Sequence, residues 1–379
     1  MDITNIKIGG DCTLYPPIKT GIELIKTFEK IGYDSIWFED HLMGIMPESI
    51  WTPDVFTLAK YMDNAHCHLE TFTMMAVAAL NTKKPILGTC VTEAFRRHPA
   101  LIAQSILSID HLSKGRTILG LGAGEQENII PYGIKWDKPF KRLEEAIQII
   151  KLFFDNDEKV SFKGDIFKLD DAVIGLSPIK KRKPPPIWIA AHGPKMLDLT
   201  GRVADGWIPL FPNCFNIQIY KEKLNNVLNS AKKAKRNPES ITPSLFIPLI
   251  IENDHEECHK LINSPIGKLQ SLVLPSKIYE TFGFKHPLGK DFRGLIDFIP
   301  TRHSRDSVLD AFDKIPLEIC EKIIVHGTPE DIIQELENYI NVGLRHIVLF
   351  NLTFFSDLTK INTSHDCIKE VIEYFKKNY

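Results

Sequence analysis

The chain has 379 residues, which exceeds the usual single domain, although α/β barrels with insertions reach this size. Its 48 acidic and 46 basic side chains nearly balance, so nucleic acid is an unfavoured partner. Seven cysteines, odd in number and never spaced as Cys-x-x-Cys, indicate reduced thiols rather than a disulfide framework. No signal-like N-terminal segment or long apolar run occurs, and we therefore expect a soluble, cytoplasmic protein.

Short apolar segments alternate with amphipathic ones along the chain. A strand predicted at 6–8 is followed by a helix at 21–30, with Gly32 in the position that ends helices. Further strands are predicted at 35–38, 85–91, 117–121, 187–191, 206–208, 245–251 and 346–350. About eight such units favour an α/β fold of the closed (β/α)8 TIM type over an open sheet, although periodicity alone does not separate the two.

Two long segments interrupt this alternation, at about 43–70 after the second strand and at about 264–305 in the C-terminal third. Long loops inside compact domains usually serve a function. The first segment is expected to wall a substrate pocket, and the second is a candidate for a lid or a dimer contact. Both are interpreted as insertions in a single domain that covers residues 1–379.

Ionisable groups follow two of the predicted strands. Asp40 and His41 end the apolar run that starts at Asp34, and Glu125 follows the run at 117–121. Barrels carry their chemistry at the carboxyl ends of the strands, so a His and a Glu meeting there predict proton handling. The alternative is that Asp40 or His41 caps the loop or satisfies buried backbone groups. Trp51, beside Pro53, is equally consistent with a pocket wall and with packing.

The glycines Gly120, Gly122 and Gly124 suggest a dinucleotide loop at first sight. The Rossmann pattern needs Gly-x-Gly-x-x-Gly opening directly into a helix, whereas here the next helix is expected only at about Pro139. We therefore interpret the segment as a glycine-rich barrel loop that presents Glu125.

Two histidine patterns resemble metal sites. His255 and His259 fit His-Glu-x-x-His, but they lie on a predicted helix of about two turns with polar residues facing outward. His66, His68 and Glu70 have suitable side chains with weak spacing. Neither pattern is taken as a metal site at this stage, and no metal is predicted.

In several segments, in order, the chain resembles the bacterial-luciferase-like superfamily and, within it, the enzymes that use the deazaflavin coenzyme F420. The matching segments are Gly32–His41, Leu87–Thr92, Arg97–Gln104, Gly120–Glu125 with Asn128, Ile189–Met196, Ala204–Trp207 and Gly327–Asp331. The fold of that family is a TIM-type barrel, in agreement with the strand count.

The resemblance implies a set of cofactor contacts. Asp40 and Asn128 would hydrogen-bond the deazaflavin, and a cis peptide bond between Cys90 and Val91 would lie behind its ring. The backbone turn formed by Ala191, His192 and Gly193, which precedes a helix, would hold the cofactor phosphate. Many relatives carry Gly or Ser in place of His192.

The function implied is hydride transfer between F420 and a carbonyl or alcohol carbon of a small molecule, with His41 and Glu125 as the catalytic proton-handling residues and Trp51 beside the substrate. The resemblance is strongest to mycobacterial ketoreductases and to sugar-phosphate and secondary-alcohol dehydrogenases. The alternatives are a methylene-tetrahydromethanopterin reductase, an FMN-dependent monooxygenase and a non-catalytic flavin-binding protein. A homodimer is expected from the resemblance alone.

Overall fold

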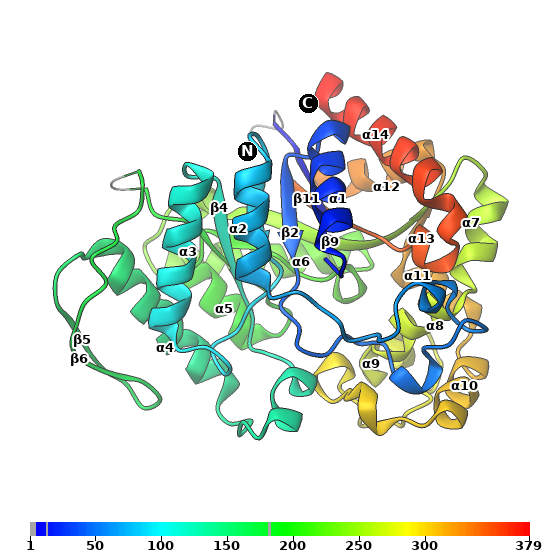
Figure 1. Cartoon of the computed structure of the whole chain (residues 1–379), viewed down its shortest axis with the longest axis horizontal. Coiled ribbons are helices and arrows are strands. Elements are labelled where there is room, and N and C mark those ends of the chain that lie inside the picture. Colours follow the sequence, from blue (N-terminus) through cyan, green and yellow to red (C-terminus); the bar gives the residue numbers. More distant parts are fainter. Residues whose placement is uncertain (1–4, 13, 181–182) are drawn as a thin grey trace.

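Eight parallel strands form a closed barrel (Figure 1) in the computed structural model, which describes residues 5–12, 14–180 and 183–379. The pairing runs β1–β2–β3–β4–β7–β8–β9–β11 and returns to β1. These strands are β1 (Lys7–Asp11), β2 (Ser35–Phe38), β3 (Ile86–Thr89), β4 (Thr117–Leu121), β7 (Ile187–Ile189), β8 (Gly206–Trp207), β9 (Thr242–Ile251) and β11 (His346–Asn351). The predicted (β/α)8 barrel is confirmed, and each predicted strand overlaps one of its eight strands.

Side chains of the strands alternate between the barrel interior and the surrounding helices, as successive residues of a strand must. In β2, Trp37 belongs to the interior cluster, while Ile36 and Phe38 belong to the layer between strands and helices. In β11, Val348 faces inward between two residues that face the helices. Both faces of each strand are thereby covered with apolar contacts, which explains the nearly continuous apolar runs in the sequence.

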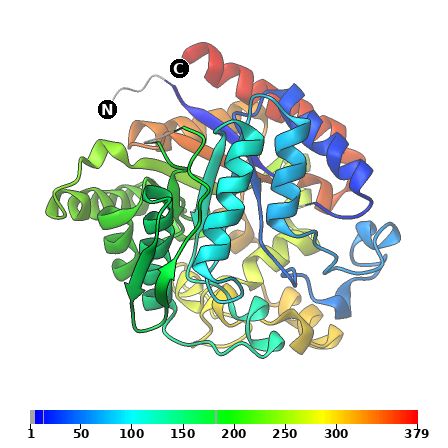
Figure 2. The same ribbon diagram turned by 60° about the vertical axis from the view of Figure 1, so that its left-hand side comes forward.

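Each barrel strand is followed along the chain by a helix that packs on the outside of the barrel, as in right-handed βα units (Figure 2). Gly32 ends the first of them in a left-handed conformation with φ of 106°, which glycine adopts without strain. The surrounding helices are α1 (Ile18–Ile31), α2 (Thr71–Asn81), α3 (Pro99–Ser113), α4 (Pro139–Asp155), α5 (Pro194–Val203), α6 (Ile217–Lys233), α12 (Pro329–Asn341) and α14 (Ile361–Asn378).

Several elements lie outside this repeat. A hairpin joins β5 (Val160–Lys163) to β6 (Lys168–Ala172), and β10 (Val325–Gly327) pairs with the last residues of β9. The other helices are α7 (His255–Ile262), α8 (Pro265–Leu272), α9 (Ser276–Thr281), α10 (Arg305–Asp313), α11 (Leu317–Ile323) and α13 (Thr353–Ser356). Short 3₁₀ turns connect many of them, including η1 (Glu48–Ile50), η2 (Thr57–Lys60) and η3 (Gln126–Asn128).

The two predicted insertions share one apolar cluster, separate from that of the barrel. Residues Met46, Ile50 and Phe56 of the first segment pack in the same cluster as Ile266 and Leu269 of the second. In Figures 1 and 2 the two segments lie away from the carboxyl terminus, which is at the top of each view. Residues 43–70 and 264–305 therefore form a joint cover at one mouth of the barrel. The assignment of the whole chain to one domain stays a prediction.

Among the described residues, no helix is both long and apolar enough to cross a membrane.

Candidate active site

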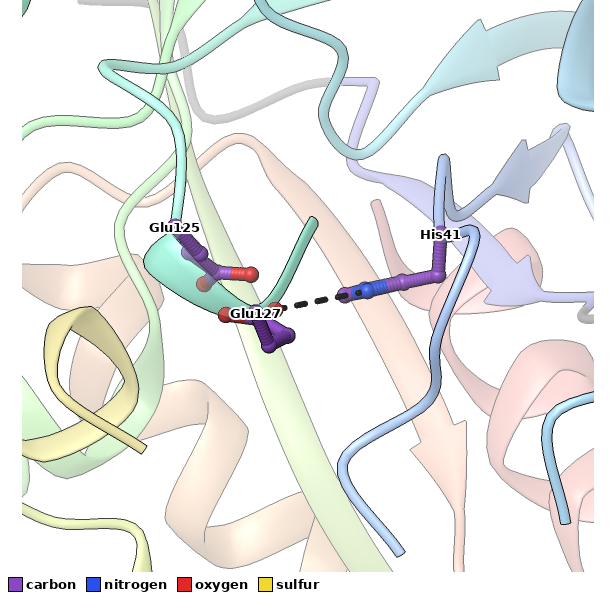
Figure 3. Close-up of side chains that lie close together, drawn as sticks. All are labelled: His41, Glu125 and Glu127. Carbon is purple, nitrogen blue, oxygen red and sulfur yellow. Dashed lines mark ion pairs between the residues drawn. The ribbon is translucent and has the colours of Figure 1, made fainter. Parts of the chain in front are cut away.

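Loops leaving β2 and β4 bring three ionisable side chains together. His41 follows β2, while Glu125 and Glu127 lie at and within the 3₁₀ turn η3 after β4. One ligand atom from each of the three lies within 4.8 Å of the others, and Figure 3 shows His41 pointing toward the glutamates. The meeting of His41 and Glu125 over one site, expected from the sequence, is thus present, and Glu127 is an addition.

Asn128 connects these groups, and its amide orientation is fixed by the backbone. Its Oδ1 accepts hydrogen bonds from the backbone N–H groups of Leu42 and Met43, at 2.7 and 3.1 Å. Its Nδ2 therefore carries the hydrogens, and it lies 2.8 Å from His41 Nδ1 and 2.9 Å from Glu127 Oε1. The oxygen and the amide nitrogen of Asn128 are both engaged within the protein, so its predicted contact with a cofactor stays a prediction.

This hydrogen bond determines the state of His41. Because Asn128 donates to Nδ1, that nitrogen accepts the hydrogen bond through its lone pair and carries no proton. The ring proton of a neutral His41 is therefore on Nε2. Burial lowers the pKa of His41 below its usual value, against the attraction of Glu125. The 3.6 Å contact between His41 Nδ1 and Glu127, the dashed line in Figure 3, is consequently not an ion pair near neutral pH. His41 is a neutral imidazole with one N–H to donate.

Glu127 is almost fully buried next to a second carboxyl group. Burial raises the pKa of Glu127 well above its usual value, and the charge of Glu125 raises it further. Two neighbouring carboxyl groups cannot both ionise cheaply, which favours a proton on Glu127. The Oε2 atom of Glu127 is buried and has no hydrogen-bond partner among the described residues. The site thus places a carboxyl group with a raised pKa beside His41.

Asp40 lies at the junction of the loops after β2 and β3. Its carboxylate accepts a hydrogen bond from Thr92 Oγ1 at 2.6 Å and pairs with Arg97 and, at 3.1 Å, with Arg96. Arg96 also donates to the backbone oxygen of Asp40 and pairs with Glu93. Asp40 thus joins the loops after β2 and β3. Its predicted hydrogen bond to a cofactor ring stays a prediction.

A cavity lies on the other side of His41, under the joint cover. Its wall includes the apolar side chains Ile45, Met46, Trp51, Met62, Phe350 and Phe355. Trp51 donates a hydrogen bond to the Met62 carbonyl at 2.7 Å and stacks on Phe56, so it is packed and also faces the cavity. The first insertion therefore walls this pocket, as expected, while a contact of Trp51 with substrate stays a prediction.

The glycine-rich loop after β4 is explained by close packing. A Cβ on Gly120 would lie 1.9 Å from the Thr89 carbonyl oxygen, and one on Gly122 would lie 2.7 Å from the Val91 side chain. The predicted cis peptide bond between Cys90 and Val91 is present at this contact. The chain then enters η3 rather than a helix, and α4 starts at Pro139 as predicted. The loop brings β3 and β4 together and presents the glutamates.

The N-terminus of α5 is open. Gly193 is its N-cap, with no side chain accepting from the first turn, and a Cβ there would meet no atom within 4 Å. His192 Nδ1 is buried without a hydrogen-bond partner, and burial lowers the pKa of His192 to about 3. Free backbone N–H groups and the positive end of the helix dipole suit a phosphate. This turn therefore fits a phosphorylated cofactor.

The side chains of His66, His68 and Glu70 do not come together as one group. His66 pairs with Glu48 at 3.0 Å, and Glu70 caps α2 and pairs with Arg97. His68 instead lines the cavity, with its ring centre 5.9 Å from that of His41. Sequence reasoning did not select His68, Glu127 or Arg96 for the site. A second acidic residue two positions after Glu125 was the available signal for Glu127.

Comparison with known proteins identifies a matching family and several relatives of this chain. The family described as luciferase-like monooxygenase matches residues 3–346. A phthiodiolone/phenolphthiodiolone dimycocerosates ketoreductase from Mycobacterium tuberculosis is 36% identical over 324 residues, covering 85% of this chain and 84% of that protein. A 5,10-methylenetetrahydromethanopterin reductase from Methanolobus tindarius is 28% identical, covering 85% of this chain and 87% of its own length.

Among solved structures, an F420-dependent secondary alcohol dehydrogenase in complex with an F420-acetone adduct is similar, with a TM-score of 0.72. The match covers 97% of this chain and 99% of that one at 23% identity, which establishes the shared fold.

Proposed function

This chain belongs to the luciferase-like monooxygenase family and is an oxidoreductase, and we propose that it transfers hydride between coenzyme F420 and a carbonyl or alcohol carbon of an apolar small molecule. The names of its relatives support this proposal, since one is a ketoreductase and the similar solved structure is an F420-dependent alcohol dehydrogenase. Homodimer formation is part of the same proposal.

The observation that carries the proposal is the buried His41 at the wall of a mostly apolar cavity, with the carboxyl group of Glu127, whose pKa is raised by burial, beside it. A deazaflavin supplies and accepts hydride, which leaves proton management to the protein. The Nε2–H of His41 donates to the substrate oxygen, stabilising the negative charge that develops on a carbonyl during reduction. In the reverse direction the same N–H orients the alcohol oxygen by a hydrogen bond, and the alcohol proton passes to water, because Nε2 already carries the one ring proton.

Glu125 and Glu127 provide the second proton position. Burial and the neighbouring carboxyl group raise the pKa of Glu127, which makes Glu127 the better proton donor of the two. We assign the proton at the ring nitrogen of the cofactor to this pair and the hydrogen bond that polarises the substrate oxygen to His41, with the proton of that oxygen exchanged with water. Asn128 is a positioning residue, because it acts on both through hydrogen bonds.

The open N-terminus of α5 supports cofactor binding at this turn, because Gly193 leaves room there and the buried Nδ1 of His192 has no hydrogen-bond partner. Ala191, His192 and Gly193 would hold its phosphate, and Cys90 and Val91 would lie against its ring. The apolar wall formed with Trp51 favours an apolar ketone or secondary alcohol over a sugar phosphate.

Fluorescence titration of the purified protein with oxidised F420, and separately with FMN, tests the proposal. Saturable micromolar binding of F420 with little FMN binding is expected, followed by F420 reduction with apolar secondary alcohols. Preferential FMN binding, with oxygen consumed when reduced FMN is supplied, would instead indicate a monooxygenase. Turnover of methylene-tetrahydromethanopterin but of no ketone or alcohol would contradict the substrate assignment and leave the cofactor assignment standing.

A further inference from the structure

A glutamine of the joint cover faces the cavity beside His41. Gln270 lies on α8, in the second of the two segments that form the cover. Ile266, one turn earlier on the same helix, also lines the cavity, so the two side chains project to the same side of α8. Gln270 is only 8% exposed. A buried polar side chain is therefore directed at a cavity whose wall is mostly apolar.

The amide group of Gln270 has no hydrogen bond to any of the described residues, and its two polar atoms are not enclosed by protein. The neighbouring polar side chains of α8 are paired. Ser271 donates to a backbone oxygen within the helix at 3.0 Å, and Lys268 donates to the Ile315 carbonyl oxygen at 2.7 Å. Buried polar groups in folded proteins almost always have a partner. The amide, with one acceptor oxygen and two N–H donors, is thus left for a molecule in the cavity.

His68 adds a second polar group, from the first segment of the cover. It lines the same cavity, and its ring forms no hydrogen bond with the described residues. Nε2 is enclosed beside Gly44, where a Cβ would lie 2.4 Å away, so Nδ1 is the ring nitrogen that a ligand can reach. The ring centres of His68 and His41 are 5.9 Å apart. Burial lowers the pKa of His68 to about 3, and the ring is therefore uncharged near neutral pH.

The charge of the cavity wall restricts what these groups can bind. Among the described residues that line the cavity, Glu39 supplies a carboxyl group, and there is neither a lysine nor an arginine. A phosphate or carboxylate at this place would lose its hydration without gaining a cation, which is unfavourable. A neutral amide and a neutral imidazole suit the oxygen of a hydroxyl or carbonyl group instead.

We propose that His68 and Gln270 bind a second, uncharged oxygen of the substrate, so that the substrate is a ketone or secondary alcohol with a hydroxyl or carbonyl group a few bonds from the reacting carbon. This inference rests on the proposed function, which places the reacting oxygen at His41. The two residues determine specificity and take no part in proton transfer. Because they come from different segments of the cover, the second oxygen is bound only when both segments pack together.

Binding of two matched ketones tests the inference without the cofactor. One is a medium-chain β-hydroxy ketone, and the other is the same ketone without the hydroxyl group. Tryptophan fluorescence reports binding, since Trp51 is in the cavity wall. The native protein should bind the hydroxy ketone at least about tenfold more tightly, because a site with polar groups rejects an analogue that leaves them unpaired.

Gln270→Met keeps the length of the side chain and removes its hydrogen-bonding groups, and His68→Phe does the same for the ring. Each should reduce the preference to less than about threefold. Gln148→Met, on the exposed side of α4, should keep the full preference. In the F420-linked assay, Gln270→Met should raise KM for the hydroxy ketone and leave kcat unchanged. If Gln270→Met does not fold by circular dichroism, Gln270→Leu replaces it.

Equal affinity of the native protein for the two ketones, or binding of neither, would overturn the inference. So would an unchanged preference in both folded variants. A native preference that Gln270→Met and His68→Phe remove, in a protein that neither binds F420 nor reduces either ketone, would support the second oxygen site and contradict the proposed function. The two failures are thereby distinguished.

Discussion

At the scale of single residues, the chemistry of this site depends on which nitrogen of His41 carries the proton. The backbone N–H groups of Leu42 and Met43 orient Asn128, and Asn128 in turn leaves Nδ1 of His41 as an acceptor. Burial then keeps the ring neutral by lowering its pKa. A neutral imidazole donates through Nε2 at any pH above its lowered pKa, which suits an enzyme that must polarise a carbonyl oxygen.

Replacing His41 with alanine should lower kcat by about 100-fold or more, because loss of one hydrogen-bond donor to a developing oxyanion costs roughly 10²–10³ in rate. Affinity for F420 should change little, since the proposed role of His41 lies at the substrate oxygen. Stopped-flow measurement of F420 reduction, together with the binding titration, separates the two quantities. An unimpaired rate with saturating substrate would remove His41 from the mechanism.

The variant Asn128→Asp tests positioning. A carboxylate facing Nδ1 accepts instead of donating, so the pKa of His41 should rise and the acidic limb of the kcat/KM profile should move up by about one pH unit. The backbone bonds to Leu42 and Met43 can be kept by the new carboxylate. Asn156→Asp on the exposed surface is the matched control. An unshifted profile would mean that Asn128 has only a structural role.

At the scale of elements, helix α5 begins without a side-chain cap, as α1, α4 and α8 also do. Asp254 and Ser304 cap α7 and α10 through their side chains, and Thr328 forms a capping box at α12. At α5 the N-cap is Gly193, and the first-turn N–H groups are left for the proposed phosphate.

Gly193→Asp should therefore have opposite effects on stability and on binding. The added side chain has space and a suitable backbone conformation, so it should cap α5 and raise the stability of the free protein by a few tenths of a kcal/mol. Its charge occupies the place of a phosphate and should weaken F420 binding at least tenfold. Gly193→Ser, a cap without charge, should weaken binding less. Equal F420 affinity in Gly193→Asp and the native protein would locate the phosphate elsewhere.

At the scale of the whole molecule, the free energy of unfolding depends on histidine side chains that are buried in their uncharged form. Burial lowers the pKa of His68, His192 and His346 to about 3 each. In the barrel interior, Trp37 donates to Ser35, and the Ser35 hydroxyl group is left to donate to His346 at 2.8 Å. Protonation of His346 would put a charge beside Trp37 and Trp188 with no acid to pair with it among the contacts of the ring.

Stability should accordingly decrease on acidification. Below about pH 6.5 the unfolded chain binds protons at these positions that the folded chain does not, so the free energy of unfolding falls as the pH is lowered toward 3, by up to about 1.4 kcal/mol per pH unit for each residue. Glu127 and Glu335, whose pKa values are raised, increase the stability on acidification instead, but they are outnumbered by the histidines with lowered pKa values. The melting temperature at pH 5.5 should lie several degrees below that at pH 7.5. A melting temperature that is constant or higher at pH 5.5 would contradict this account.

The barrel could be predicted from the sequence because each strand is a short apolar run between helical segments, and because a strand buried on both faces has few polar residues to obscure it. Asp40, His41 and Glu125 were identifiable because they follow such runs directly. The orientation of Asn128 and the packing of residues 43–70 against 264–305 depend on contacts between distant segments, which no local pattern encodes.

The joint cover packs mainly within one apolar cluster, distinct from the cluster between strands and helices. Residues 43–70 and 264–305 contribute to that cluster together, and the first segment also contacts the site, where the Met43 N–H group donates to Asn128. Replacement of either segment alone would therefore leave apolar side chains of the other without their packing partners and should destabilise the cover. Joint replacement of both segments keeps those contacts and changes the wall of the cavity as one unit.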